Sequence, residues 1–166
     1  MATQFAVDSN FLMDCAHPKD DALDALDVIR QRVPYARIVL TPTAFSELVH
    51  HAMDDSSLAK RKLANAALRQ IRARGVALVE LGEMQTITAK RVARRLLEEE
   101  IIPPKERNDA HIVGEAAVLE CPMLISSDWH VRDADRERME RVLRECGVPM
   151  VAVRKPWEIV RKFDER

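Results

Sequence analysis

The chain has 166 residues, with 26 lysines and arginines against 27 aspartates and glutamates, and its formal net charge is −1. A chain of this length suits one domain, residues 1–166, with a sizeable hydrophobic core. The balanced charge excludes a global positive field, so any binding of nucleic acid depends on a local patch.

The cysteines are odd in number and lie far apart in the sequence, at Cys15, Cys121 and Cys146. No pair has the spacing of a metal site or a redox motif, which favours reduced, buried thiols. The N-terminus lacks a basic region followed by an apolar signal core, and no apolar run approaches the length of a membrane span. We therefore expect a cytoplasmic protein that does not enter a membrane.

Short apolar runs alternate with helical patterns along the chain. Strands are predicted at residues 4–7, 37–40, 76–79, 123–125 and 148–153. Apolar residues at helical spacing predict helices at residues 20–33, 42–52, 57–74, 83–101 and 133–146. Three more helices are predicted: one that begins at residue 11, one that runs from residue 109 to the proline at 122, and one that begins at residue 156. Strands separated by helices imply an α/β fold with parallel pairing and helices on both faces of the sheet. The proline at 149 suggests an edge position for the last strand.

Four acids occupy corresponding places in this pattern. Asp8 and Asp128 each follow a predicted strand, whereas Glu47 lies on the helix after the second strand. Asp109 begins the helix that leads into the fourth strand, on the same face as its apolar residues. The carboxyl ends of parallel strands converge on one crevice, where ligands bind, so we expect these four side chains to meet.

A meeting of four carboxylates is unfavourable unless their charge is compensated. Like charges a few ångströms apart cost on the order of several kcal/mol at an intermediate dielectric. Protons or divalent cations must balance them, and a set of oxygen ligands without His or Cys selects Mg²⁺ or Mn²⁺. Such ions catalyse phosphodiester hydrolysis, because they activate a water molecule and stabilise the attacking and leaving oxygens.

Other polar residues near the acids fit lesser roles. Asn10 and Ser126 are expected to orient the acids or a water molecule rather than bind metal directly. The histidines His50, His51, His111 and His130 match no zinc pattern. We interpret them as surface or lining residues.

These motifs together resemble the PIN-domain ribonucleases. Asp8-Ser9-Asn10 is similar to the family's opening D-[ST]-N, and Phe45-Ser46-Glu47-Leu48 resembles its second-helix acid. Asn108-Asp109-Ala110 resembles the family's helix-start aspartate, and Ser126-Ser127-Asp128 resembles its [ST]-x-D after the fourth strand. Each motif alone is weak, but all four in order, each in its expected element, are fairly specific. The resemblance runs from Asp8 to the terminal helix at 156.

The resemblance implies a three-layer α/β/α sandwich with a central, mostly parallel sheet, and cleavage of RNA with Mg²⁺ or Mn²⁺. Asp8, Glu47, Asp109 and Asp128 would be the catalytic metal ligands. Small single-domain members, the VapC type, are often toxins that a partner antitoxin holds inactive, and a homodimer is left open. Some members have a further acid after the fourth strand. Asp133 and Asp135 are candidates, although a solvated charge at a helix start fits both better.

Two basic helix faces bear on RNA binding. One lies between residues 60 and 74, and the other places Arg91, Arg94 and Arg95 near the middle of the helix at 83–101. Such faces are most often simply solvated, and holding an RNA backbone is the functional alternative. The scarcity of aromatic residues argues against base stacking as the main source of RNA affinity.

Two other functions compete with a ribonuclease. A degenerate scaffold would bind RNA or protein without cleaving, and the intact acid set argues against it. A phosphatase with Asp8 as nucleophile typically needs a second acid two residues later, where this chain has Asn10. Nucleotide sites of the P-loop and dinucleotide types are excluded, because the chain has only four glycines and no glycine-rich loop.

Overall fold

A computed structural model gives the structure of the chain and describes residues 2–17, 20–127, 129 and 133–164. The strands are β1 (Gln4–Val7), β2 (Arg37–Leu40), β3 (Val76–Leu78), β4 (Met123–Ile125) and β5 (Ala152–Arg154). The helices are α1 (Ser9–Ala16), α2 (Asp20–Arg32), α3 (Pro42–Asp54), α4 (Leu58–Gln70), α5 (Glu83–Glu98), α6 (Arg107–Val118), α7 (Asp133–Glu145) and α8 (Pro156–Asp164), with a 3₁₀ turn, η1, at Pro104–Glu106.

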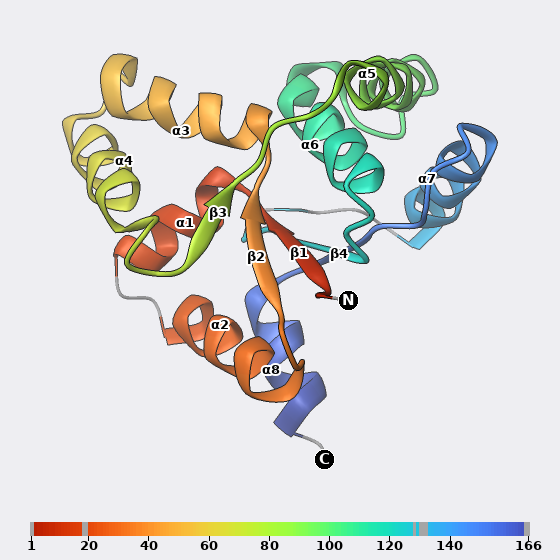
Figure 1. The fold of residues 1–166 in the computed structure, drawn as a ribbon. Helices are drawn as coiled ribbons and strands as arrows, with labels where there is room; N and C mark the ends of the chain where they lie inside the picture. Colours follow the sequence, from red (N-terminus) through yellow and green to blue (C-terminus); the bar gives the residue numbers. More distant parts are fainter. Residues whose placement is uncertain (1, 18–19, 128, 130–132, 165–166) are drawn as a thin grey trace.

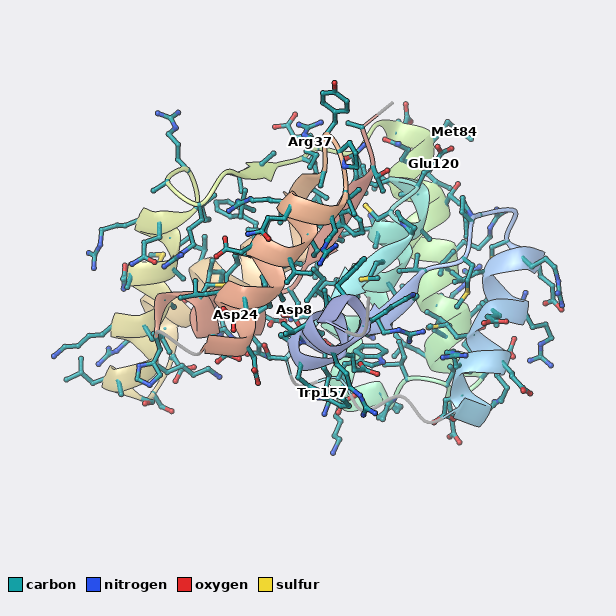
Figure 2. All side chains as sticks on the ribbon, turned by 90° about the horizontal axis from the view of Figure 1, so that it is seen from below. Asp8, Asp24, Arg37, Met84, Glu120 and Trp157 are labelled. Carbon is teal, nitrogen blue, oxygen red and sulfur yellow. The ribbon has the colours of Figure 1, made fainter. Side chains whose placement is uncertain are left out.

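The described strands form one parallel sheet in the order β3-β2-β1-β4-β5 (Figure 1). In its register Ala6 of β1 lies between Val39 of β2 and Leu124 of β4. Packed together, α2 and α8 cover one face, while α3, α5 and α6 cover the other (Figures 1 and 2). The expected three-layer α/β/α sandwich is therefore confirmed.

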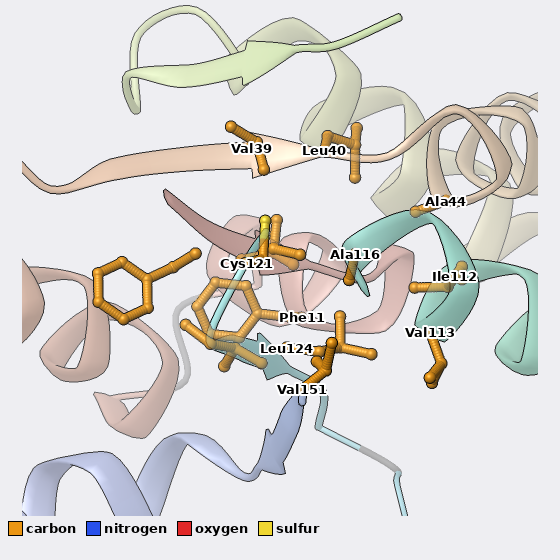
Figure 3. Close-up of a cluster of buried hydrophobic side chains, with 14 of the residues drawn as sticks. Phe11, Val39, Leu40, Ala44, Ile112, Val113, Ala116, Cys121, Leu124 and Val151 are labelled. Carbon is orange, nitrogen blue, oxygen red and sulfur yellow. The ribbon is translucent and has the colours of Figure 1, made fainter. Parts of the chain in front are cut away.

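The hydrophobic core fills the space between sheet and helices. Figure 3 shows Phe11 of α1 beside Leu124 of β4, with Ile112 of α6 nearby, and all three are buried. Strands with helices on both faces bury alternate residues on either side, which is why they read as continuous apolar runs. The three cysteines are free and buried, as the sequence predicted.

The two edges of the sheet differ in character. Parallel strands place every carboxyl end on the same edge, and Asp8 follows the end of β1. Figure 2 shows Asp8 and Trp157 on this edge and Arg37 and Glu120 on the opposite one. Because Arg37 begins β2 and Glu120 precedes β4, that opposite edge carries the amino ends of the strands.

Some predicted boundaries are wrong. The helix expected to run to Pro122 ends at Val118, because Glu120 adopts a left-handed conformation (φ 56°) and the amide of Cys121 returns to the carbonyl of Ala116 at 2.9 Å. The last strand begins at Ala152 rather than at 148, which leaves Pro149 ahead of it. β5 does lie at an edge, as the proline suggested.

Other helices also begin or end away from their predicted positions: α5 ends at Glu98 rather than at 101, and α6 begins at Arg107 rather than at 109. The first helix begins at Ser9 because the Asp8 side chain caps it, two residues before the predicted start. The helix predicted to reach residue 74 ends at Gln70, and Gly75 follows it with φ 63°. None of the helices in the described part of the chain is long and apolar enough to cross a membrane.

Candidate functional site

The Asp8 carboxylate lies at the carboxyl end of β1, buried to 6% residual exposure. It is the N-cap of α1 and accepts a hydrogen bond from the amide of Phe11 at 2.8 Å. Capping satisfies one of the free amides of the first helical turn, so the side chain is held in one direction. The backbone amide of Asp8 donates to the carbonyl of Ile125 at 3.2 Å, which fixes Asp8 beside the end of β4.

Burial raises the pKa of Asp8 from 3.8 to about 7. Hydrogen bonds from the Ser126 side chain and the Phe11 amide act against this rise, since they stabilise the charged form. The negative charges of Asp109 and Glu47 add to it. Asp109 and Glu47 are thus near enough to act on Asp8, although the three acids come from different elements.

Glu47, on α3, is held by polar side chains from two other helices. One of its carboxylate oxygens accepts a short hydrogen bond from the hydroxyl of Ser9, on α1. The other accepts from the side-chain amide of Asn108, on α6, at 3.0 Å. Ser9 and Asn108 are neighbours of predicted ligands in their motifs, but the sequence analysis gave them no role of their own.

His51 lies one turn after Glu47, between two carboxylates. Its Nε2 is 3.8 Å from Glu47 Oε1, and its Nδ1 is 3.0 Å from Asp55 Oδ2. Asp55 also accepts from the amide of Ser57 at 2.9 Å, and this bond above all lowers its pKa. His51 therefore lies against one of the predicted ligands, whereas the side chain of His50 is exposed and lies 3.4 Å from Asp54.

The structure describes three of the four remaining predicted residues. Asp109 is half-buried in the first turn of α6 and acts on Asp8 through its charge. Ser126 is buried directly after β4 and hydrogen-bonds Asp8. Asn10 is half-buried in the first turn of α1. Asp128 lies outside the described residues, so its position relative to the other acids stays a prediction.

The candidates for a further acid lie on α7. Asp133 is its first residue, and Asp135, two residues further on, is half-buried. A position in the first turn suits an acidic side chain without any ligand, because negative charge stabilises a helix start. The interpretation as solvated helix-start charges remains a prediction for both.

The described residues, which leave out Asp128, hold no group of three or more His, Cys, Asp or Glu side chains arranged to bind an ion. Hydrogen bonds from the protein itself occupy the acids: Ser9 and Asn108 on Glu47, and the amide of Phe11 on Asp8. The donor chemistry nevertheless fits a hard divalent cation, since carboxylate oxygens dominate the set.

A cavity of about 380 Å³ opens beside Glu47. Its lining residues are Pro42, Thr43, Ser46, Glu47, His50 and Asn108. The amino-terminal half of α3 and the first turn of α6 therefore form its walls. The Glu47 carboxylate is reached through this cavity.

The arginines of α5 are engaged within the protein. Arg91 donates to the carbonyl of Cys146 at 3.1 Å, and Arg94 lies 3.9 Å from Glu98. Arg95 contacts Glu99 at 2.5 Å and Glu145, on α7, at 2.7 Å. The contacts of Arg91 and Arg95 join α5 to α7 and the residue that follows it, and RNA binding by the three arginines stays a prediction.

Three solved structures resemble the chain over nearly its whole length. VapBC2 from Rickettsia felis, bound to a DNA fragment from its promoter, matches with a TM-score of 0.63 at 11% identity, over 92% of this chain and 98% of that one. VapBC-1 from nontypeable Haemophilus influenzae matches with a TM-score of 0.60 at 14% identity, and DNA-bound VapBC from Salmonella typhimurium with 0.58 at 15%. Both matches cover 93% of this chain and 98% of the other.

The chain has the PIN-domain fold. No protein-family model and no curated protein matches its sequence. At identities of 11–15% the likeness establishes the architecture and not the chemistry, so the site is argued from its own residues. In this chain Asp8 follows β1 at the carboxyl edge of the sheet, and Glu47 and Asp109 approach it from α3 and α6.

Proposed function

We propose that this PIN-domain protein is a divalent-metal-dependent endoribonuclease that hydrolyses RNA phosphodiester bonds. The observation that carries the proposal is the Asp8 carboxylate, buried at the carboxyl edge of the sheet with Glu47 and Asp109 acting on its pKa. A buried acid with acidic neighbours is costly for folding, and such perturbed groups concentrate at functional sites. A cation that binds there would offset the repulsion.

The residues that would hold the cation are Asp8, Glu47 and Asp109, with Asp128 added from the sequence motif. Their oxygen ligands favour Mg²⁺ or Mn²⁺. When bound, such an ion supplies an activated water and neutralises charge that develops on the phosphate. The chain's own polar groups prepare the site: Ser9 and Asn108 orient Glu47, and Ser126 hydrogen-bonds Asp8.

We further propose that the protein acts as the toxin of a toxin–antitoxin pair in the cytoplasm, with an antitoxin protein as its partner. The support is structural, because all three similar structures are VapBC proteins. A homodimer belongs to the same proposal. Light scattering of the purified chain measures its assembly state, and an elution at the mass of one chain, 18.9 kDa, would refute the dimer.

The test of the activity is cleavage of labelled RNA by the purified protein with Mn²⁺, with Mg²⁺ and with EDTA. We expect cleavage with either metal, none with EDTA, and loss of cleavage in the Asp8→Asn variant. Asp24→Asn is the matched control, since it removes an exposed acid from α2, which covers the face of the sheet opposite α3 and α6 (Figure 1). Cleavage that persists unchanged in Asp8→Asn would refute the proposal, because it would come from a contaminant.

The toxin role has a separate test in cells. Induced expression of the wild-type chain should arrest growth of a bacterial host, whereas Asp8→Asn at the same expression level should not. Normal growth with a wild-type protein that cleaves RNA in vitro would refute the toxin role and leave the nuclease proposal standing.

A further inference from the structure

Glu115 is a buried acid that the proposed reaction does not use. It lies on α6 with 6% exposure, and both of its carboxylate oxygens bind Thr43, in the first turn of α3. Oε2 accepts from the Thr43 amide at 3.0 Å, and Oε1 accepts from the Thr43 hydroxyl at 2.6 Å. A buried carboxylate is costly unless hydrogen bonds satisfy it, so this contact is specific.

The start of α3 needs this contact because its own capping is incomplete. Thr41 is the N-cap, but its hydroxyl accepts from the Ala44 amide at a long 3.5 Å. Pro42 has no amide hydrogen to offer, so the Thr43 amide is the first free donor of the helix. Glu115 takes that donor from the neighbouring helix.

Thr43 and Glu47 form one side of a paired contact between α3 and α6. They lie four residues apart on α3, so they share a face. Asn108 and Glu115 lie seven residues apart on α6, which again places them on one face. Glu115 binds Thr43 and Asn108 binds Glu47, so two polar bridges join the same faces of the two helices.

The two helices also pack through small and apolar side chains. Figure 3 shows Ala44 of α3 close to Ile112 of α6, which lies between Asn108 and Glu115 in the sequence, and both side chains are buried. Close-packed contacts of this kind transmit displacement, because the interior has little free volume. A shift at the Glu115 bridge would therefore be passed to the Glu47 bridge.

We propose that Glu115 is a positioning residue for the acid cluster. By holding the first turn of α3 against α6, it sets the location of the Glu47 carboxylate relative to Asp8 and Asp109. The effect of Glu115 on metal binding rests on the proposed function. The positioning of Glu47 by the bridge between Glu115 and Thr43 does not rest on it, and the experiment tests the two claims separately.

The test compares Glu115→Ala and Glu115→Gln with a control, Leu96→Ala. Glutamine can still accept a hydrogen bond from the Thr43 amide and donate one to the Thr43 hydroxyl, so Glu115→Gln should keep the bridge between α6 and α3. Leu96 is a fully buried residue of α5, and its truncation destabilises the fold without touching either bridge. Thr43→Val is a second variant, which removes only the 2.6 Å hydrogen bond and keeps the acid.

The first readout is the Mn²⁺ dissociation constant, measured by electron paramagnetic resonance at a temperature where each variant is folded. Loss of a group that orients a metal ligand typically weakens binding by about tenfold or more, which we expect for Glu115→Ala. Thr43→Val should show a smaller change of the same sign, and Glu115→Gln and Leu96→Ala should bind like the wild type. Wild-type Mn²⁺ affinity in Glu115→Ala would overturn the inference.

The second readout is metal-free: the NMR signal of the Asn108 side-chain amide, which donates to Glu47. We expect it to move in Glu115→Ala and to stay in place in Leu96→Ala. A wild-type chain without Mn²⁺ affinity, combined with a moved Asn108 signal, would refute the metal proposal and support the positioning role. An Asn108 signal that stays in place in Glu115→Ala and in Thr43→Val would overturn the positioning role.

Discussion

The amide nitrogen of Asp8 donates a hydrogen bond of 3.2 Å to the carbonyl oxygen of Ile125. This bond extends the parallel ladder in which Val7 pairs with Ile125, so the ends of β1 and β4 lie side by side. Asp8 directly follows β1 and is buried there. Ser126 directly follows β4 and hydrogen-bonds the Asp8 side chain. The burial of Asp8 is thus imposed by backbone pairing and not by side-chain choice.

The burial of Asp8 predicts a pH-dependent stability of the metal-free protein. Its pKa is about 7 in the folded state against an ordinary 3.8, so between these values the folded state holds a proton that the unfolded state has lost. The contribution of Asp8 to stability is therefore greatest below about pH 4, falls as the pH rises toward 7, and is then constant, with a total loss on the order of 4 kcal/mol. Urea unfolding in EDTA at pH 5 and pH 8 measures the part of this loss that falls above pH 5, about 3 kcal/mol.

The variant Asp8→Asn should remove most of that pH dependence. Asparagine keeps an oxygen that can accept from the Phe11 amide, so the cap of α1 survives. We expect the unfolding free energy of Asp8→Asn to change much less between pH 5 and pH 8 than that of the wild type, and Asp24→Asn to behave as the wild type. Equal slopes in all three proteins would contradict a raised pKa at Asp8.

Asp109→Asn should separate metal binding from stability. Removal of its charge relieves repulsion on Asp8, so the metal-free variant should melt at a higher temperature than the wild type. The same change removes a proposed ligand. Saturating Mn²⁺, which at 100 times its dissociation constant would stabilise the wild type by about 2.7 kcal/mol, should then raise the melting temperature little or not at all. Differential scanning calorimetry at increasing Mn²⁺ concentration measures this rise. An equal rise in the melting temperatures of the wild type and the variant would count against the site.

The architecture was predictable because its signals are local. Apolar runs such as Phe5-Ala6-Val7 and helix starts such as Thr41-Pro42 specify their elements within a few residues, and the alternation of the two types implies the parallel sheet. The helix end at Val118 was not predictable in this way. Glu120 adopts a left-handed conformation that glycine or asparagine would normally signal.

The candidate site was predictable only in part, for a related reason. Asp8 and Glu47 could be named from motifs, but the groups that hold Glu47 lie 38 residues away at Ser9 and 61 residues away at Asn108. No spacing in the sequence specifies such long-range hydrogen bonds, since they depend on how the helices pack. The contact between His51 and Asp55 follows four-residue helical spacing and could have been predicted.

Gly114→Ala should destabilise the fold through the contact between α5 and α6. A Cβ at Gly114 would stand 2.5 Å from the carbonyl oxygen of Ala89, so the two helices would have to move apart. Overpacking of this kind costs roughly 1–3 kcal/mol. Gly82→Ser is the control, because a Cβ there meets nothing nearer than 3.7 Å. Denaturant unfolding measures the stability of both variants. Wild-type stability in Gly114→Ala would show that Gly114 does not lie so close to the Ala89 carbonyl.

Arg95→Gln should reveal whether this arginine serves the fold or the substrate. Its guanidinium contacts Glu99 and Glu145 and so joins α5 to α7, which predicts a lower melting temperature in the variant. The difference should shrink as salt is added, because partly exposed ion pairs are screened. Glu145→Gln is the matched control, since it removes the ion pairs of Glu145 with Arg95 and Arg141 and keeps both arginines. We expect both variants to lose stability and to keep the wild-type KM for RNA. A KM that rises in Arg95→Gln alone, with the melting temperature unchanged, would instead support an RNA contact.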